Sequence, residues 1–425
     1  MTFVRVRPGM RWSRLTWLGA LTLAACGGIA ERDDRPTPTP SVPTTPAPSD
    51  SGSGGAAGAG GFGSTGGTSG AGGLTGPGGA PPYVPKAIYA GDETSFAILS
   101  DGRVASWGRN DSGELGHPGS GLFSVDDLGF VPTLVSADDH TCFLDSAGVI
   151  RCAGSNGYFE LGDGTNKSRS DPTRVTVISD PATIVAAGPN QTCAYTTPPM
   201  LRCWGQGFAD AQLRMLSEGV EYVDLAVGGN HECALRADKT IACWGEYTMW
   251  DHGTNYGYAL AIDITSIGRV AQLVAGFSYS CARTAEGRVW CWGDNENSQL
   301  GTPAVMGSCP SDCEATPHLI DLPPGAEAAK IVAKSNSTVA LTSDGRLFGW
   351  GGVPHDGVCG RGLICTSAPR QLADFDDITD VSLGSGHLCV LRRDNSVWCW
   401  GDNDYHQVAN TGGSFIAAPV RVMPR

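Results

Sequence analysis

Five cysteine pairs with one constant spacing constrain this fold more than any other feature. Ten of the fifteen cysteines stand ten residues apart in copies of one motif: Cys142 with Cys152, Cys193 with Cys203, Cys233 with Cys243, Cys281 with Cys291, and Cys389 with Cys399. In the clearest copies, two alternating apolar runs flank a turn dipeptide such as Glu-Gly or Asp-Asn, which is typical of an antiparallel β-hairpin. Cysteines ten residues apart then face each other within disulfide reach. Zinc ligands usually come as more closely spaced pairs, so the pattern favours disulfides.

Two further copies complete the series without cysteines. They carry Phe96 with Ser106, and Val339 with Gly349, at the paired positions. The loss of both partners together is what a bonded pair predicts. The seven copies follow one another at a mean step of about 49 residues, a period that indicates a β-propeller.

Each unit contains two more predicted strands. An apolar run ending in a small-Gly corner precedes the hairpin, as in residues 88–91 and 273–276. Earlier still comes a short run that we interpret as an edge strand, because its proline has no N–H to donate. These runs begin at Pro132, Pro172, Pro317 and Pro369. The sequence thus predicts an all-β, seven-bladed propeller of four-stranded blades.

The C-terminal strand is expected to close the ring. The first copy begins at Ile88 without a clear proline-led strand, whereas residues 419–422 follow the last hairpin with no further hairpin to serve. Pairing residues 419–422 into the first blade would remove two open sheet edges.

The order of motifs resembles a known repeat. Pro-x-x-Val, apolar-Ala-Gly, His-x-Cys and Asp-Gly-x-Val are followed by Trp-Gly-x-Asn-x-x-Gly-x-Leu-Gly, as in residues 107–116 and 292–301. Over about residues 83–425 the chain resembles the regulator of chromosome condensation repeat family, which implies a seven-bladed propeller. Function does not follow, because members include a nuclear guanine-nucleotide exchange factor and a secreted bacterial β-lactamase inhibitor. Copies three and four depart from the motif after their Trp-Gly.

The N-terminus predicts a bacterial lipoprotein. Four arginines precede a short apolar stretch that ends in Leu-Ala-Ala-Cys, which resembles a lipobox. Residues 1–25 are therefore predicted to be a signal peptide, and Cys26 to carry the lipid; plain secretory cleavage is the alternative. Gly27 follows Cys26, which in Gram-negative sorting implies the outer membrane or the cell surface. Inner or outer membrane stays open, because the choice depends on the organism.

A tether and a globular head complete the domain organisation. Residues 26–82 are rich in Pro, Gly and Ser and do not bury enough apolar surface to fold, whereas residues 83–425 form the propeller. Fifteen cysteines minus Cys26 leave an even number, and seven disulfides would require an oxidising compartment. The cysteines outside the hairpins close two local pairs or bridge blades, and sequence does not decide which: Cys309, Cys313, Cys359 and Cys365.

Charge argues against two functions known in the family. The predicted signal peptide carries four arginines and no acid, so its removal changes the net charge from −14 to −18. Nucleic acid is an unlikely match for such a surface, because Lys and Arg hold phosphate backbones. A lipoprotein would not meet a cytosolic GTPase, so we expect neither partner.

The sequence contains none of the common catalytic motifs, such as Gly-x-Ser-x-Gly or His-Glu-x-x-His. We therefore expect no catalytic site, no cofactor and no metal. His140, His231 and His387 recur at one repeat position, which favours hydrogen bonds that build the blades. The acidic runs 294–297 and 402–404 fall where the motif has a polar turn and lack the pattern of a calcium loop. The recurring tryptophans are interpreted as blade core: Trp107, Trp204, Trp244, Trp292, Trp350 and Trp400.

Function is sought where the repeat breaks. After Trp244-Gly245 the polar turn is replaced by an aromatic, glycine-rich segment, residues 246–258. Tyr and Trp are favoured at recognition surfaces, although these side chains would also fill a shortened blade. The candidate ligand-binding residues are Tyr247, Trp250, His252, Tyr256 and Tyr258. The other long insertions should surround the same face: the insert with Phe123 and Phe130, the Cys309–Cys313 and Cys359–Cys365 loops, and Tyr405 with His406.

These observations predict a monomeric, extracytoplasmic binding module anchored to a membrane through Cys26, with a protein or a glycan as its ligand. The sequence does not name that ligand. A hydrolase or lyase that uses the propeller channel is the first alternative, and it would need convergent carboxylates or a metal cluster at the channel mouth. A structural envelope protein without a ligand is the second alternative.

Overall fold

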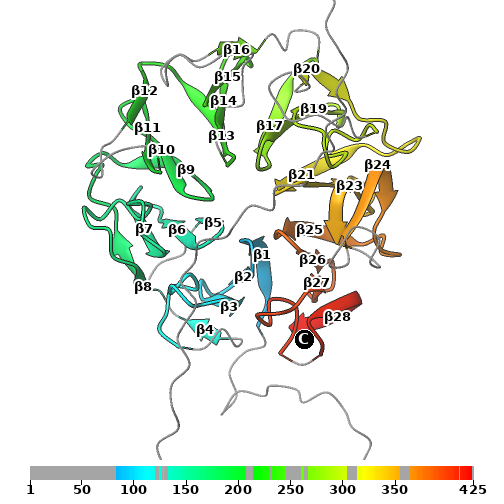
Figure 1. Cartoon of the computed structure of the whole chain (residues 1–425), viewed down its shortest axis with the longest axis horizontal. Coiled ribbons are helices and arrows are strands. Elements are labelled where there is room, and N and C mark those ends of the chain that lie inside the picture. The colour runs from blue at the N-terminus through cyan, green and yellow to red at the C-terminus, as the bar shows by residue number, and fades with distance from the viewer. Residues whose placement is uncertain are drawn as a thin grey trace, which may run out of the picture. The chain divides into compact units, whose positions relative to one another are not determined.

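Seven four-stranded antiparallel sheets stand in a ring in the computed structural model (Figure 1). It describes residues 83–119, 124–126, 128, 133–206, 214–229, 231–245, 260–262, 267–303, 314–354, 363–410 and 412–423. Within these ranges no helix is long and apolar enough to cross a membrane. The predicted all-β, seven-bladed propeller is confirmed.

Every blade is built from four consecutive strands, from the centre of the ring outward. The first three blades are β1 (Pro85–Ala90), β2 (Thr94–Leu99), β3 (Val104–Gly108) and β4 (Ser124–Asp126); β5 (Thr133–Ser136), β6 (His140–Leu144), β7 (Ile150–Gly154) and β8 (Arg169–Arg174); β9 (Ala182–Gly188), β10 (Gln191–Thr196), β11 (Met200–Gly205) and β12 (Arg214–Glu218). The fourth and fifth are β13 (Tyr222–Val227), β14 (His231–Arg236), β15 (Ile241–Gly245) and β16 (Leu260–Ile262); β17 (Val270–Ala275), β18 (Tyr279–Thr284), β19 (Val289–Gly293) and β20 (Glu314–Leu319). The last two are β21 (Ala328–Lys334), β22 (Ser337–Thr342), β23 (Leu347–Pro354) and β24 (Leu363–Gln371); β25 (Ile378–Leu383), β26 (His387–Arg392), β27 (Val397–Asp402) and β28 (Phe415–Met423).

The central hairpin of each blade has the predicted register. In five blades the two cysteines of a pair lie directly opposite each other on neighbouring strands. A disulfide with its two Cα atoms 4.1 Å apart joins Cys142 to Cys152, Cys193 to Cys203, Cys233 to Cys243, Cys281 to Cys291, and Cys389 to Cys399.

The two remaining hairpins keep the register without cysteines. In the first blade Phe96 faces Ser106, and in the sixth Val339 faces Gly349. The structure does not decide how the cysteines outside the hairpins are paired. Cys309, Cys313 and Cys359 lie outside the described residues, as does the side chain of Cys365, so their connectivity stays open.

The predicted C-terminal closure is wrong. Residues 419–422 belong to β28, which pairs with β27 of the seventh blade and not with the first blade. The runs led by Pro172, Pro317 and Pro369 are edge strands, but each completes the blade that precedes it in sequence. With this assignment of the edge strands, each blade contains four strands that are consecutive in the sequence. None of the described strands is then left to pair across the junction between the last and first blades.

One proline-led run forms an inner strand and not an edge strand. The segment after Pro132 forms β5, which pairs with β6 as the innermost strand of the second blade. Leu134 is buried there with the aromatic ring of Phe143. A four-residue pattern does not separate an edge strand from an apolar inner strand, since both are short and contain β-branched or aliphatic residues.

Apolar packing between neighbouring blades closes the ring. Ile88 and Trp107 of the first blade share one buried cluster with Leu391, Val397 and Met423 of the seventh. Second strands such as β2 and β22 are buried along their whole length, because a blade lies on either side. Their continuous apolar runs follow from burial on both faces.

Side chains of the inner strands add polar links between consecutive blades. The Asp380 carboxylate accepts the N–H of Ile88 at 3.1 Å, across the junction between the last and first blades. Asp224 accepts the N–H of Leu273 at 2.8 Å, and the side-chain oxygen of Gln272 accepts that of Ile331 at 3.0 Å. The junction that closes the ring therefore has the same kind of bond as two internal junctions.

Candidate binding face

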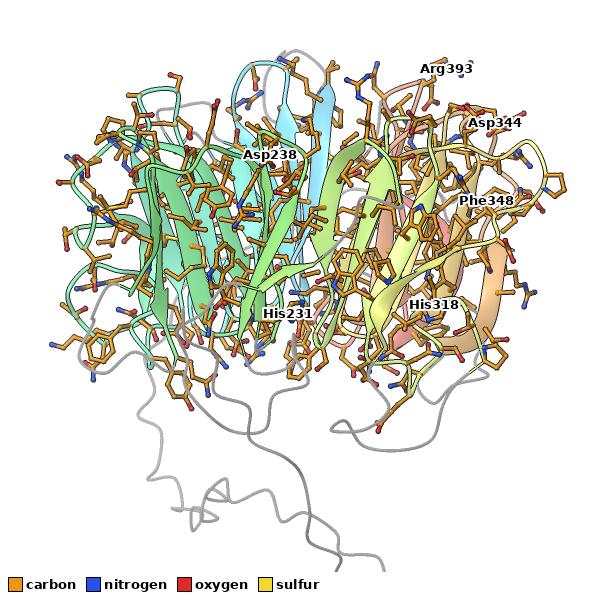
Figure 2. All side chains as sticks on the ribbon, turned by 90° about the horizontal axis from the view of Figure 1, so that it is seen from above. His231, Asp238, His318, Asp344, Phe348 and Arg393 are labelled. Atoms are coloured by element: carbon orange, nitrogen blue, oxygen red, sulfur yellow. A yellow bond between two sulfur atoms is a disulfide. The ribbon has the colours of Figure 1, made fainter. Side chains whose placement is uncertain are left out.

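The two faces of the ring differ in the segments that they carry. On one face, which we call the loop face, lie the turns between first and second strands and the long connections between third and fourth strands. The opposite face, the turn face, carries the hairpin turns between second and third strands. Figure 2 shows Asp344 and Arg393, from two such turns, toward one edge, and His231, which begins a second strand, toward the other.

The predicted ligand-binding residues lie outside the described part of the chain. Tyr247, Trp250, His252, Tyr256 and Tyr258 all belong to the connection between β15 and β16, and β15 ends at the loop face. Phe123 is in the corresponding connection of the first blade and is also outside the described residues. Phe130, between β4 and β5 in the sequence, also lies outside the described residues.

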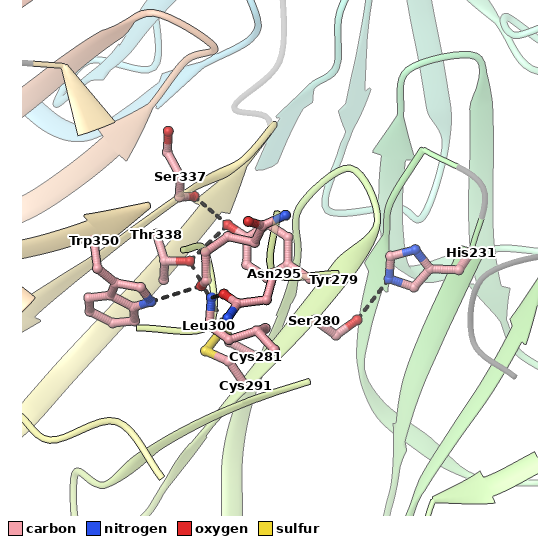
Figure 3. Close-up of a disulfide and its surroundings, with 11 residues drawn as sticks. His231, Tyr279, Ser280, Cys281, Cys291, Asn295, Leu300, Ser337, Thr338 and Trp350 are labelled. Atoms are coloured by element: carbon pink, nitrogen blue, oxygen red, sulfur yellow. Dashed lines mark hydrogen bonds between the residues drawn. A yellow bond between two sulfur atoms is a disulfide. The ribbon is translucent and has the colours of Figure 1, made fainter. Parts of the chain in front are cut away.

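The polar motif after Trp-Gly builds ordered loops in the first, second, fifth and seventh blades. In the fifth blade the Asn295 side chain accepts the N–H of Leu300 at 3.0 Å (Figure 3). The side chain of Gln299 accepts the N–H of Asn297 at 2.7 Å. The carbonyl of Gln299 then accepts the indole N–H of Trp350 in the next blade at 3.0 Å. Trp107 and Trp204 make equivalent bonds. All six recurring tryptophans are buried, as the repeat position predicted.

The recurring histidines also join blades. His231 Nε2 is 2.8 Å from the hydroxyl of Ser280 in the next blade (Figure 3), and His140 and His387 make equivalent bonds to Thr192 and Ser95. All three imidazoles are buried. Burial lowers their pKa to about 3 for His140 and to about 4 for His231 and His387, so they are neutral at pH 7.

Three exposed aromatic side chains lie on the loop face, one each in the second, fifth and seventh blades. Tyr158 is 51% exposed, Phe277 46% and Tyr405 38%. Tyr158 and Tyr405 occupy the same position in the polar loops of the second and seventh blades, and the Arg109 guanidinium lies 5.4 Å from the Tyr405 ring centre. Among the described residues, the other large exposed apolar side chain is Val223, where β13 begins near the turn face.

Sequence reasoning named Tyr405 as part of this face but missed Phe277. Phe277 follows the small-Gly corner of the fifth blade, where the corresponding residues include Asp92, Ser335 and Ser385. A large aromatic residue at a position otherwise held by small or polar residues was the available signal. One part of the ring packs against Gly229, where an added Cβ atom would lie 2.8 Å from it.

The loop face is acidic. Arg109 lies among four carboxylates, 2.8 Å from Asp139, 3.1 Å from Glu93, 3.2 Å from Asp111 and 3.7 Å from Glu114. Other described carboxylates here are Asp92, Asp138, Glu160, Asp163, Asp294, Glu296, Asp402 and Asp404, whereas the other described cations are Lys167, Arg169 and Lys334. Negative potential on one face favours encounter with cationic partner surfaces.

Inner strands of all seven blades line a central channel with a cavity of about 600 Å³. At its loop-face end, the Lys334 ammonium is 3.1 Å from Asp92 and 3.0 Å from Asp138. Carboxylates therefore do converge at the channel mouth, but both bind a lysine. Among the described residues, one group has the spacing of metal ligands, Cys193, Cys203 and Glu232. Its two cysteines are joined in a disulfide, which removes the thiolates that a metal would need.

Comparison with protein families identifies the repeat. The model of the regulator of chromosome condensation (RCC1) repeat matches residues 86–114, 270–299, 328–360 and 378–407, and a second model of this repeat matches residues 286–341. These stretches correspond to parts of the first, fifth, sixth and seventh blades.

Relatives and solved structures agree with this match. The Ultraviolet-B receptor UVR8 of Arabidopsis thaliana is 25% identical over 348 residues, 76% of this chain and 78% of the receptor. The E3 ubiquitin-protein ligase HERC2 of Homo sapiens is 30% identical over 130 residues, which are 28% of this chain and only 3% of the ligase. Prp20p from Saccharomyces cerevisiae superimposes with a TM-score of 0.64 at 18% identity, covering 81% of this chain and 88% of Prp20p. Human WBSCR16 gives a TM-score of 0.60 at 19% identity over 74% and 88%.

Proposed function

We propose that this chain, which carries RCC1 repeats in a seven-bladed propeller, is an extracytoplasmic binding module whose loop face recognises another protein. The observation that carries the proposal is the collection of exposed aromatic side chains on one face. Tyr158, Phe277 and Tyr405 all lie there, together with the connection that contains Trp250. Large, rigid aromatic side chains are frequent anchors in protein interfaces.

The scaffold suits this role. Its hairpins, polar loops and histidines are committed to bonds within and between blades, which leaves variation to the connections on the loop face. Loops on a rigid framework are common sites of recognition. Prp20p, which has the same fold, binds Gsp1p and histones. At 18% identity only the fold is transferred to this chain, and its partner has to be found independently.

The proposed address is a membrane surface outside the cytoplasm. The Leu-Ala-Ala-Cys sequence before residue 27 supports lipidation of Cys26, and the five hairpin disulfides support an oxidising compartment. Residues 26–82 would separate the propeller from its anchor. This address and the net charge of −14 argue against nucleic acid and a cytosolic GTPase as partners.

Partner capture with matched variants tests the binding face. We expect Trp250→Ala, Tyr256→Ala, Phe277→Ala or Tyr405→Ala to weaken capture of an envelope partner, with about thirtyfold loss for a central anchor and little change in melting temperature. Val223→Ala is the control, because Val223 is as exposed as Phe277 but lies toward the turn face. Loss of capture with Val223→Ala alone would move the site to the turn face. Intact capture with a lowered melting temperature for the Trp250 and Tyr256 variants would show that their loop is packing.

A further inference from the structure

The contacts at the loop-face end of the channel indicate a switch that is independent of partner binding. We propose that Asp92, Asp138 and Lys334 form a proton-sensitive latch, which ties the sixth blade to the first and second at this end of the channel. The latch is assembled from three segments that are distant in sequence, the turns β1–β2 and β5–β6 and the last residue of β21.

The geometry joins blades that are not neighbours. Lys334 ends the inner strand of the sixth blade, and its ammonium reaches past the seventh blade to Asp92 and Asp138. Ser385 of the seventh blade donates its hydroxyl to Asp92 and lies 2.6 Å from the hydroxyl of Ser335. Backbone bonds run from the Ser385 N–H to the Asp92 carbonyl and from the Asp92 N–H to the Ala137 carbonyl. The seventh, first and second blades thus meet around the lysine.

The charge count makes the latch sensitive to protons. Lys334 is 15% exposed, Asp92 25% and Asp138 30%, so all three groups have lost much of their contact with water. Two carboxylates and one ammonium carry a net charge of −1, which is unfavourable in a poorly solvated site. One added proton makes the group neutral, and two close carboxylates commonly share such a proton.

Asp138 is the group that takes the proton. Burial and the nearby Asp92 carboxylate together raise the pKa of Asp138 to about 7, against the opposing effect of the Lys334 ammonium. The pKa of Asp92 is lowered: burial acts to raise it, but the Lys334 ammonium and hydrogen bonds from Asp138 and Ser385 outweigh burial. Burial acts to lower the pKa of Lys334, and the two carboxylates raise it on balance, so the ammonium keeps its charge.

The other titratable groups around the latch have partners of their own. Glu93 and Asp139 bind Arg109, beside the latch. Burial raises the pKa of Glu93, although Arg109 opposes this. His140 and His387 lie below the turns and have lowered pKa values of about 3 and 4, so they are neutral above about pH 4. Asp138 differs from these groups because its carboxylate contacts Lys334 directly and its pKa is raised to about 7.

The direction of the pH effect follows from linkage. In an open latch, Asp138 returns to its ordinary pKa of 3.8, whereas in the closed latch it holds its proton up to about pH 7. Proton binding therefore favours the closed form. The ratio of closed to open latch should fall about tenfold for each pH unit between about 4 and 7, and should be lowest above pH 7.

Hydrogen exchange of the purified chain tests the latch. We expect protection of the backbone amides in residues 331–336, corrected for intrinsic exchange rates, to fall by up to about a hundredfold between pH 5 and pH 7. Global unfolding has the opposite trend, because the buried histidines destabilise the fold as pH falls. Constant protection across this range, or protection that falls toward acid pH with global stability, would overturn the proposal. The unmodified chain therefore decides the question by itself.

Two variants assign the effect to Asp138. Asp138→Asn cannot ionise, so protection of residues 331–336 should remain at its acid-pH level from pH 5 to pH 7. Asp139→Asn is the matched control, because Asp139 is the next residue, binds Arg109 and lacks a bond to Lys334 among the ion pairs described above. It should keep the pH dependence of the unmodified chain. If Asp138→Asn also keeps that dependence, Asp138 is not the switch.

Discussion

At the scale of single residues, the repeat positions decide which polar groups are structural. His140, His231 and His387 begin the second strand of their blades, and each bonds a hydroxyl in the following blade. Because their pKa values are lowered, these imidazoles take up a proton near neutral pH only when the chain around them unfolds. In an unfolded chain the same imidazoles titrate near pH 6.5.

The buried histidines predict acid sensitivity of the whole fold. Because the folded pKa lies below the unfolded value, their contribution is complete above pH 6.5 and is lost as pH falls toward 4. Each should reduce the free energy of unfolding by about 1.4 kcal/mol per pH unit in that window. Denaturant titration at pH 7.5 and 5.5 measures the slope.

His231→Gln should reduce this pH slope by about 1.4 kcal/mol per pH unit, because the contribution of one buried imidazole is removed. His406→Gln is the control, since His406 is exposed on the seventh polar loop. An unchanged slope in His231→Gln would show that the imidazole is already charged in the folded chain, or that it titrates normally.

At the scale of elements, the hairpin is the repeating unit of stability. Five hairpins have a cross-strand disulfide, whereas the sixth blade fills the same place by packing. A Cβ atom on Gly349 would lie 2.7 Å from a methyl group of Leu372 and 2.9 Å from Val353. Leu372 and Val353 thus fill the space opposite Val339 that a second cysteine occupies in other blades. Packing takes the place of the disulfide in this blade.

Peptide mapping under non-reducing conditions should recover the five hairpin pairs from protein made in its native compartment. Cys281→Ala with Cys291→Ala should lower the free energy of unfolding by about 2–3 kcal/mol, because the unfolded chain loses a short closed loop. The difference should shrink when both proteins are unfolded in reductant. Free thiols or bound zinc at these positions would contradict the assignment and the proposed compartment.

The sequence predicted hairpins and their register because Cys, Gly and apolar residues recur at fixed offsets. It did not predict which hairpin the fourth strand pairs with. Pro172 and Pro419 lie on edge strands, yet the chain between two hairpins contains both the end of one blade and the start of the next. Local patterns do not mark that boundary. The latch was also hidden: Asp92 and Asp138 hold one repeat position in two blades, but Lys334 lies one position earlier in its own copy, and the three meet only through the curvature of the ring.

At the scale of the whole molecule, the proposed anchor determines where the loop face can act. Mass spectrometry of the native protein should find a diacylglyceryl group on Cys26 and no residue before it. Cys26→Ser should move the protein from the membrane fraction to the soluble fraction while partner capture in solution is retained. Continued membrane association of the processed Cys26→Ser protein would show that something else holds it there.

Among the described strands, none crosses the junction between β28 and β1, and this has an evolutionary and engineering consequence. The first and the seventh blade, which contain β1 and β28, are joined by packing and by the Asp380 bond to Ile88, much as interior blades are joined. The blade at which the chain starts is therefore independent of how the blades follow one another around the ring. A circular permutant cut between any two blades preserves every intra-blade pairing, and duplication of one repeat adds a complete blade without rewiring its neighbours.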